Sequence, residues 1–569
     1  MTANTDLLQA RFDGVPVEAE PVSLSGGEWI GRPYRYELFL RSGTALIDPD
    51  KLLSTRAVIT IATDKEHERY VTGLVRSLAQ EPADNARWWN YRVVIEPRFA
   101  FLAEASDCRF FENKSAKDIA SLILGEFGIR DVAWRSAEPP ARPYTVMFNE
   151  TYLAFVERIL AAEGLFYFFE FSDKGETLVI GDSNSAFHRI AHPEVDFGTQ
   201  GGVLSGMDSW HRLDAVAAGR IEAGDYNPEI STTSISGSVS TLLRTPDSER
   251  RPNYVWPADA AASGAASASV KRRMEAVEAR SRLYRGAATN PELRAGGKFS
   301  LKSAPEGGEP EYIACETGMS VTDTARTGGG RSTITVTVTA FPTATPWRPV
   351  VLPKPVMAGL YTATVIGPQG EEIHNDKLGR IKVRFPWDHR KETTDSGSFW
   401  LRVVQPWAGA GWGAQFIPRV GQEVAVTFLE GDIDRPVAVG ALYNSANTPI
   451  FPMDQKNKSG FRSRSTKNGG AADYNEFSFD DTKGSETVLL HAQKDHVIEV
   501  EHDQTMTIGN CRTVTVKKDE KITIDGAQAV TVAKTQTVKV TQDVLHQSMQ
   551  SITLKVGESS IKIDNAGIT

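Results

Sequence analysis

Residues 498–540 read IEVEHDQTMTIGNCRTVTVKKDEKITIDGAQAVTVAKTQTVKV, and this stretch repeats every eight residues. Each of its six octads carries two apolar residues of high β-propensity that are separated by a single polar residue. Each octad therefore predicts one short strand with an apolar face and a polar face. We predict that the apolar pairs form the core of the repeat: Ile498, Val500, Met506, Ile508, Val514, Val516, Ile522, Ile524, Val530, Val532, Val538 and Val540.

A straight strand cannot accommodate this pattern, because side chains alternate between its two faces. In an uninterrupted strand, Lys518 and Glu520 would lie on the same side as the valines. Burying such groups without partners is unfavourable. We therefore expect the chain to bend after each apolar pair, once in every octad.

One copy of such a repeat is a poor structure by itself. Its short strands would leave their edges unpaired, and the burial of two aliphatic side chains does not offset the entropy lost by ordering eight residues. We expect several identical chains to wind around one axis, and three chains forming a triangular prism are the simplest closed solution. The alternative is a monomeric β-solenoid, although single-chain β-helices follow hexapeptide or nonapeptide repeats.

Composition limits the function classes. The chain has 569 residues, which predicts several domains. The net charge of −9 argues against nucleic acid as the main partner. Cys108, Cys315 and Cys511 lie far apart and predict neither a disulfide framework nor a zinc site. Because the N-terminal sequence lacks the features of a signal peptide and no long apolar run follows, we expect neither Sec export nor a membrane span.

Four domains are predicted along the chain. Residues 1–355 read as an α+β body around barrel-like sheets, and residues 356–446 contain five strand candidates that suit a small OB-type barrel. Residues 447–494 form a polar neck, and residues 495–569 form the octad prism. In the body, Ser115 predicts the N-cap of a first helix, Asn149 predicts the N-cap of a second, and a third lies within 265–284.

Two motifs carry a close resemblance to a known family. They are HNDKLGRIKVRFPWD at 374–388 and FWLRVVQPWAGAGWGAQFIPRVGQEVAVTFLEGDIDRP at 399–436, followed by GALYNSANTP at 440–449 and NEFSFDD at 475–481. These stretches and the octad repeat occur in the same order in the valine–glycine repeat protein G (VgrG) family, the spike of the bacterial type VI secretion system. The sequence resembles this family over nearly its whole length, and the first 350 residues resemble the phage baseplate hub.

The resemblance implies a mainly β homotrimer with a hub, an OB-fold collar and an intertwined β-prism needle. Each hub would contain two related barrel domains, so that three chains form a pseudo-sixfold ring on hexamers of the haemolysin co-regulated protein (Hcp). A PAAR-repeat protein would bind the needle tip, and an effector or its adaptor would travel with the spike. The family implies synthesis in the bacterial cytoplasm, release without a signal peptide, and puncture of a target cell membrane.

The chain departs from the family at its C-terminal end. Few Val-x-Gly units are present, and the chain stops at SSIKIDNAGIT, residues 559–569, where family members often continue. Leu554 and Val556 keep the octad phase, whereas Ile561 and Ile563 have slipped by one residue. We expect the rod to taper or to change register at this point, which bears directly on docking of the PAAR protein.

No residue pattern predicts catalysis, a metal site or a cofactor, and we expect the protein not to be an enzyme. GAGWGA at 409–414 imitates a dinucleotide-binding loop, but Pro418 prevents a helix from following it. Asp432 and Asp434 lack the spacing of a calcium loop and predict a charged turn. An embedded hydrolase would have to fit into 447–494, which is too short. A contractile phage tail spike remains the alternative function.

Overall fold

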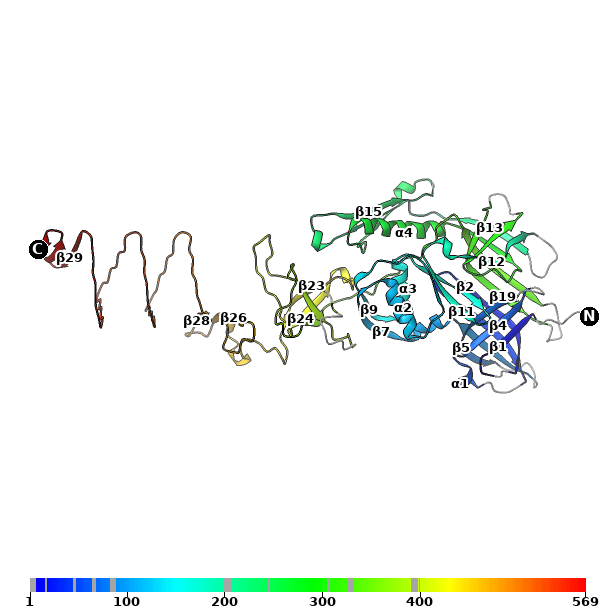
Figure 1. Cartoon of the computed structure of the whole chain (residues 1–569), viewed down its shortest axis with the longest axis horizontal. Helices are drawn as coiled ribbons and strands as arrows, with labels where there is room; N and C mark the ends of the chain where they lie inside the picture. Colours follow the sequence, from blue (N-terminus) through cyan, green and yellow to red (C-terminus); the bar gives the residue numbers. More distant parts are fainter. Residues whose placement is uncertain are drawn as a thin grey trace, which may run out of the picture. The chain divides into compact units, whose positions relative to one another are not determined.

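The structure is a computed structural model that describes residues 7–15, 18–43, 48–63, 68–81, 88–198, 206–243, 245–303, 308–324, 332–389, 398 and 400–569. The chain divides into two units, Met1–Gln493 and Lys494–Thr569, which are described separately. Strands predominate, which confirms the mainly β fold class (Figure 1). Within the described ranges, no helix has both the length and the apolar character that a membrane span requires.

The first six strands form one barrel of the hub, in the order β1-β4-β5-β6-β3-β2. β1 lies beside β2, and Asp323 bridges them: its Oδ2 accepts from the Leu8 amide at 3.2 Å, and its own amide donates to the Val22 carbonyl at 2.8 Å. The elements are β1 (Leu8–Phe12), β2 (Ala19–Trp29), β3 (Arg32–Ser42), α1 (Pro49–Leu52), β4 (Arg56–Ala62), β5 (Glu68–Glu81) and β6 (Trp89–Glu96).

A second ring of six strands follows the order β19-β18-β12-β13-β17-β20 and closes because β20 also pairs with β19. β19 pairs on its other edge with β2, so the two barrels share a seam. The two barrel domains implied for the hub are thereby confirmed. The strands are β12 (His188–Phe197), β13 (Gly206–Asp214), β17 (Arg282–Ala288), β18 (Gly297–Lys302), β19 (Tyr312–Thr322) and β20 (Thr333–Pro342).

Two helices lie between the barrels in the sequence. Ser115 and Asp118 form the predicted capping box of α2, but the predicted cap of α3 is wrong. Asn149 still belongs to β9, and Thr151 caps the helix by accepting from the Ala154 amide at 3.2 Å. The elements are η1 (Arg98–Glu104), β7 (Ser106–Lys114), α2 (Ala116–Glu126), β8 (Val132–Arg135), β9 (Arg142–Thr151), α3 (Tyr152–Ala162), β10 (Phe166–Ser172), β11 (Gly175–Gly181) and η2 (Asn184–Ala186).

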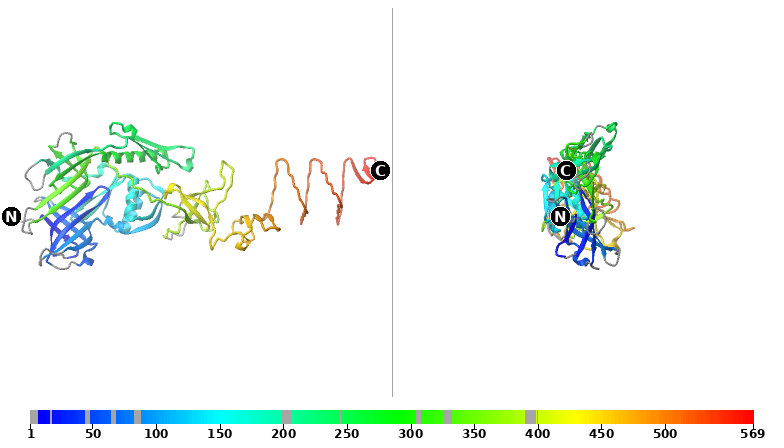
Figure 2. Two further views of the ribbon diagram at one scale, coloured as in Figure 1. Left: turned by 180° about the vertical axis from the view of Figure 1, so that it is seen from behind. Right: turned by 90° about the vertical axis from the view of Figure 1, so that its right-hand side faces the viewer.

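A small subdomain is inserted between β13 and β17. Its three-stranded sheet, ordered β15-β14-β16, packs on the predicted third helix, which Figure 2 shows beside these strands. Ile221, Ile235, Val270 and Met274 belong to its own core. The elements are β14 (Arg220–Asp225), η3 (Pro228–Ile230), β15 (Ile235–Ser240), η4 (Ser248–Arg250), β16 (Pro252–Val255) and α4 (Ser263–Ser281).

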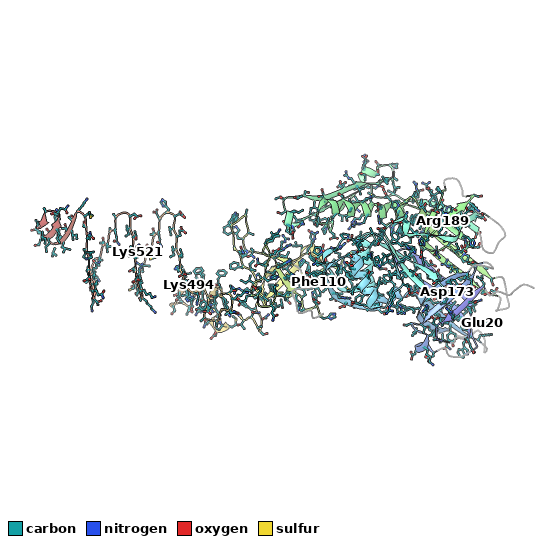
Figure 3. All side chains as sticks on the ribbon, viewed as in Figure 1. Glu20, Phe110, Asp173, Arg189, Lys494 and Lys521 are labelled. Atoms are coloured by element: carbon teal, nitrogen blue, oxygen red, sulfur yellow. The ribbon has the colours of Figure 1, made fainter. Side chains whose placement is uncertain are left out.

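The predicted OB-type barrel is confirmed as a closed sheet of five strands in the order β21-β22-β23-β25-β24. The hub contributes to its core, because Phe110 of β7 (labelled in Figure 3) and Tyr144 of β9 pack against it. The elements are β21 (Tyr361–Ile366), β22 (Ile381–Arg384), β23 (Trp400–Val403), β24 (Glu423–Phe428), η5 (Leu429–Gly431) and β25 (Pro436–Leu442).

The turn between β24 and β25 is charged, as predicted, and a lysine from the preceding connector organises it. Lys354 Nζ lies 2.7 Å from Asp259 of the inserted subdomain, and 3.2 Å and 2.8 Å from Asp432 and Asp434 of the barrel. Burial alone would lower the pKa of Lys354, but the three carboxylates raise it above its usual value. One partly buried cation therefore links the hub insertion to the barrel.

We expect Lys354→Met to destabilise the first unit by about 3 kcal/mol, because three carboxylates lose the cation they share and Arg435 remains beside only one of them, Asp432. Thermal unfolding of the full chain measures this loss. The control is Lys467→Met, since Lys467 pairs with Glu371 at an exposed site and should contribute less than about 1 kcal/mol. Equal effects of the two substitutions would contradict the linking role of Lys354.

Candidate trimerisation surface

The neck forms a three-stranded sheet that buries polar side chains and exposes apolar ones. Its elements are η6 (Met453–Gln455), β26 (Lys458–Arg462), β27 (Glu476–Asp480) and β28 (Thr487–His491), with β27 in the centre. On β27 the polar residues Glu476 and Ser478 are buried, whereas Phe477 and Phe479 are exposed. A soluble sheet normally buries its apolar face, so this face of the neck requires cover that one chain does not supply.

Cross-strand register makes the exposed apolar face continuous. Phe477 lies opposite Phe461 on one side and Leu490 on the other, and Phe479 lies opposite Val488. All five side chains are exposed in the single chain. The prediction of a polar neck at 447–494 missed this face. Alternation of Phe with polar residues in EFSFD was the signal that could have revealed it.

The aromatic surface extends onto a loop of the barrel. Phe416 stacks on Phe461 with ring centroids 6.0 Å apart, and Gln405 holds the Phe416 backbone through two hydrogen bonds. Further along the same loop, Trp407 and Trp412 pack edge to face at 5.1 Å and are both more than half exposed. The GAGWGA stretch is thus a glycine-rich loop without a following helix, as predicted, and it displays aromatic rings.

The opposite, polar face of the neck is closed by an internal ion pair. Arg462 pairs with Glu476 and also lies over the Tyr474 ring, which in turn contacts the His491 ring at 4.7 Å. Burial alone would raise the pKa of Glu476, but the hydrogen bonds from Arg462 and Ser478 and the charge of Arg462 together outweigh it and lower that pKa. The buried polar side chains Glu476 and Ser478 thus have partners within one chain, whereas the aromatic face is left for a partner chain.

The second unit confirms the predicted bends. Extended segments of six residues alternate with two-residue bends at 493–494, 501–502, 509–510, 517–518, 525–526, 533–534, 541–542 and 549–550. Most of these bends directly follow an apolar pair, as the bend after Val516 does. Figure 1 shows the resulting regular rise and fall of the chain. The period of eight found in the sequence is thus a geometric period as well.

Within this unit the single chain has no core. All twelve predicted core residues are exposed, from 46% at Ile524 to 72% at Val538. Among residues 494–550, all of which the structure describes, no main-chain group hydrogen-bonds another main-chain group. Figure 3 shows their side chains, including Lys521, projecting freely from the chain. The backbone and the apolar pairs both lack partners, so the placement of these pairs in a shared core stays a prediction.

The phase slip near the end of the chain has a simple cause. β29 (Ser551–Val556) turns back at Gly557 and pairs antiparallel with β30 (Ser559–Asp564), which is followed by β31 (Gly567–Ile568). Gly557 has φ +56°, a value that suits the first position of a two-residue hairpin turn. Leu554 consequently faces Ile561 across the hairpin. The register changes, as expected, because the strand reverses its direction.

Acid should weaken the polar face of the neck. Because the pKa of Glu476 is lower in the folded chain than its usual 4.5, the ion pair stabilises the fold above that pH and loses its effect as pH falls further. We expect Glu476→Gln to lower the unfolding temperature at neutral pH, and the difference from the wild type to shrink below about pH 4.5. Calorimetry across pH measures it, and a difference independent of pH would contradict this role.

The octad core can be tested at one position. Val530→Asp would place one carboxylate from every chain in the shared interior, and burial of such charges should split the trimer. Thr531→Asp, on the opposite face of the same segment, is the matched control and should remain trimeric. Light scattering gives both masses. A Val530→Asp protein that keeps the native mass would refute the axial position of Val530.

Three family models match successive parts of this architecture. Residues 27–324 match the phage tail baseplate hub, residues 365–443 match the type VI secretion system/phage-baseplate injector OB domain, and residues 459–567 match the C-terminal trimerisation domain of bacteriophage T4 gp5. The neck sheet and the octad repeat both lie inside the third match. That match supports assembly of the chain as a homotrimer.

Relatives and solved structures agree with these matches. The type VI spike protein VgrG1b of Pseudomonas aeruginosa is 32% identical over 88% of this chain and 69% of its own length, and VgrG3 of Vibrio cholerae is 30% identical over 89% and 51%. The E. coli c3393 protein, a type VI component with structural similarity to T4 gp27 and gp5, has a TM-score of 0.57 at 20% identity and covers 76% of this chain and 100% of its own.

The Francisella PdpA–VgrG complex has a TM-score of 0.52 at 10% identity, with coverage of 82% of this chain and 72% of its own. At such identities the two solved structures establish the fold alone. The relatives are spike proteins and the first family model is a phage tail baseplate hub, which supports a structural role. From the identity to VgrG1b and the hub match over more than half of its length, the chain belongs to the VgrG family of type VI secretion system spike proteins.

Proposed function

We propose that three copies of this chain wind their octad repeats together into a rigid point that pierces a target cell membrane and carries effectors with it. The observation behind the proposal is the missing core of residues 494–550, where unpaired backbone and exposed apolar pairs recur with one period. Three intertwined copies would pair every strand edge and bury every apolar pair. A closed prism of this kind resists bending, which a puncturing device requires.

The proposed base of the spike is the hub. Each chain carries two six-stranded barrels that share the β2–β19 seam, so three chains would present six barrels in one ring. Such a ring matches the symmetry of an Hcp hexamer, which we propose as the partner below the hub. At the other end, the proposed partner is a PAAR-repeat protein.

We further propose that effectors or their adaptors bind the spike. The solved Francisella complex, in which a VgrG is joined to a second protein, PdpA, supports this role for the fold. Delivery would begin in the bacterial cytoplasm, where the chain is made, and would end in the medium or in a target cell without removal of a signal peptide. A phage tail spike, the alternative function, has the same hub, but relatives at about 30% identity are type VI spike proteins.

Native mass spectrometry of the full chain tests assembly. We expect a species at three times 62.3 kDa, held together by the neck face and the octad repeat. A monomer at micromolar concentration would refute the intertwined spike.

Puncture has its own readout, the killing of neighbouring cells by bacteria that express this chain as their only spike protein. Val530→Asp should abolish killing and Thr531→Asp should preserve it. If both variants killed neighbouring cells equally well, puncture would not require assembly of the octad core, and the proposed mechanism would be contradicted.

A further inference from the structure

The octad contains a second set of side chains on the apolar side. In each six-residue segment the apolar pair occupies the fourth and sixth positions, and the second position has the same parity. The bends therefore take residues such as Lys518 off the apolar side but leave the second position, which includes Glu520, on it. The residues at this second position are His496, Gln504, Arg512, Glu520, Gln528 and Gln536. Two of these six, in adjacent octads, carry opposite charges.

The geometry of three intertwined chains decides which residues become neighbours. At any height the three chains occupy the three faces with the same segment, and after each bend every chain moves to the next face and up by one strand. The strand that lies above a given segment is therefore the following segment of a different chain. Residue i of one chain lies beside residue i+8 of another, at the interstrand spacing of about 4.8 Å.

We propose that Arg512 of one chain pairs with Glu520 of a neighbouring copy and that this pair sets the axial register of the trimer. The proposal rests on the trimeric spike proposed above. It places a ring of three arginines directly beside a ring of three glutamates, so each buried charge has an opposite neighbour. Lys517 and Asp525, also eight residues apart and both at the first position of a bend, agree with the same register.

A register mark is needed because the apolar pairs cannot supply one. A slip by one octad would put each apolar pair in the place of the next one. Most of these pairs consist of valine or isoleucine, so little packing would be lost. The same slip would place Arg512 beside Gln528 and leave Glu520 without its cation. A single polar position that fixes the register of an otherwise repetitive apolar interface is a known device in coiled coils.

Charge reversal tests the pair in the full chain. We expect Arg512→Glu and Glu520→Arg each to raise the apparent dissociation constant of the trimer at least about tenfold, since each removes one partner of a desolvated pair. The double variant should restore wild-type assembly. The control is Lys521→Glu, because Lys521 lies on the opposite face and its neighbours eight residues away are Thr513 and Ala529.

Coexpression shows that the pair joins different chains. Arg512→Glu chains mixed with Glu520→Arg chains should form trimers that contain both. Two of the three contacts in a mixed trimer then join opposite charges and one joins like charges, whereas all three contacts join like charges when either variant assembles alone. Native mass spectrometry identifies the mixed species. If both single variants assemble like Lys521→Glu, or the double variant assembles no better than the single ones, the pairing is wrong. A monomeric wild type would instead refute the proposed spike itself.

Discussion

Lys494–Gln550 is an extended backbone that cannot pair with itself, and the rest of the architecture depends on this constraint. Each two-residue bend turns the chain before it can fold back onto the preceding segment, so no segment becomes the hydrogen-bond partner of another in the same chain. The backbone groups and the apolar pairs then need partners that repeat with the same eight-residue period. An identical chain is the simplest source of a matching period, which is why a monomeric solenoid fits these residues poorly.

The neck, which precedes the repeat, also exposes a surface that other copies of the chain can cover. On its polar face Arg462 pairs with Glu476, whereas Phe461, Phe477 and Phe479 remain exposed. Phe416 carries this aromatic surface onto the barrel. Assembly would then not depend on the rod alone, because three necks could meet through broad aromatic contacts while the narrower octad strands wind together. The third family match, residues 459–567, spans both regions.

Local patterns in the sequence predicted much of the fold, because local physics determines those features. The capping box at Ser115, the five barrel strands and the bend after each apolar pair all follow from short-range periodicity and hydrogen bonding. Features set by distant partners were not predictable in this way. Lys354 contacts Asp259 and Asp432 only after three segments fold together. In the sequence, the reversal of the chain at Gly557 looks like a slip in the phase of the octad repeat.

The candidate site shows the same division. Alternation identified the apolar pairs of the octads, but burial of the pairs depends on other chains, and one chain cannot show which atoms they contact. The cap of α3 is an instructive error, because both Asn149 and Thr151 have suitable side chains. The extent of β9, which is set by its pairing with β7, decides between them. Where several neighbouring residues could cap a helix, pairing between strands decides which one does.

The presence of two barrels in each chain offers a way to reconcile two symmetries in the proposed spike. A rod of three chains has threefold symmetry, because each segment occupies one face, whereas a ring of six barrels can approach sixfold symmetry. The hub would reach six with three chains, because each chain holds two six-stranded barrels that share the seam formed by β2 and β19. The inserted subdomain between β13 and β17 distinguishes the two barrels, so the resulting ring would be sixfold only in its barrels and threefold in everything attached to them.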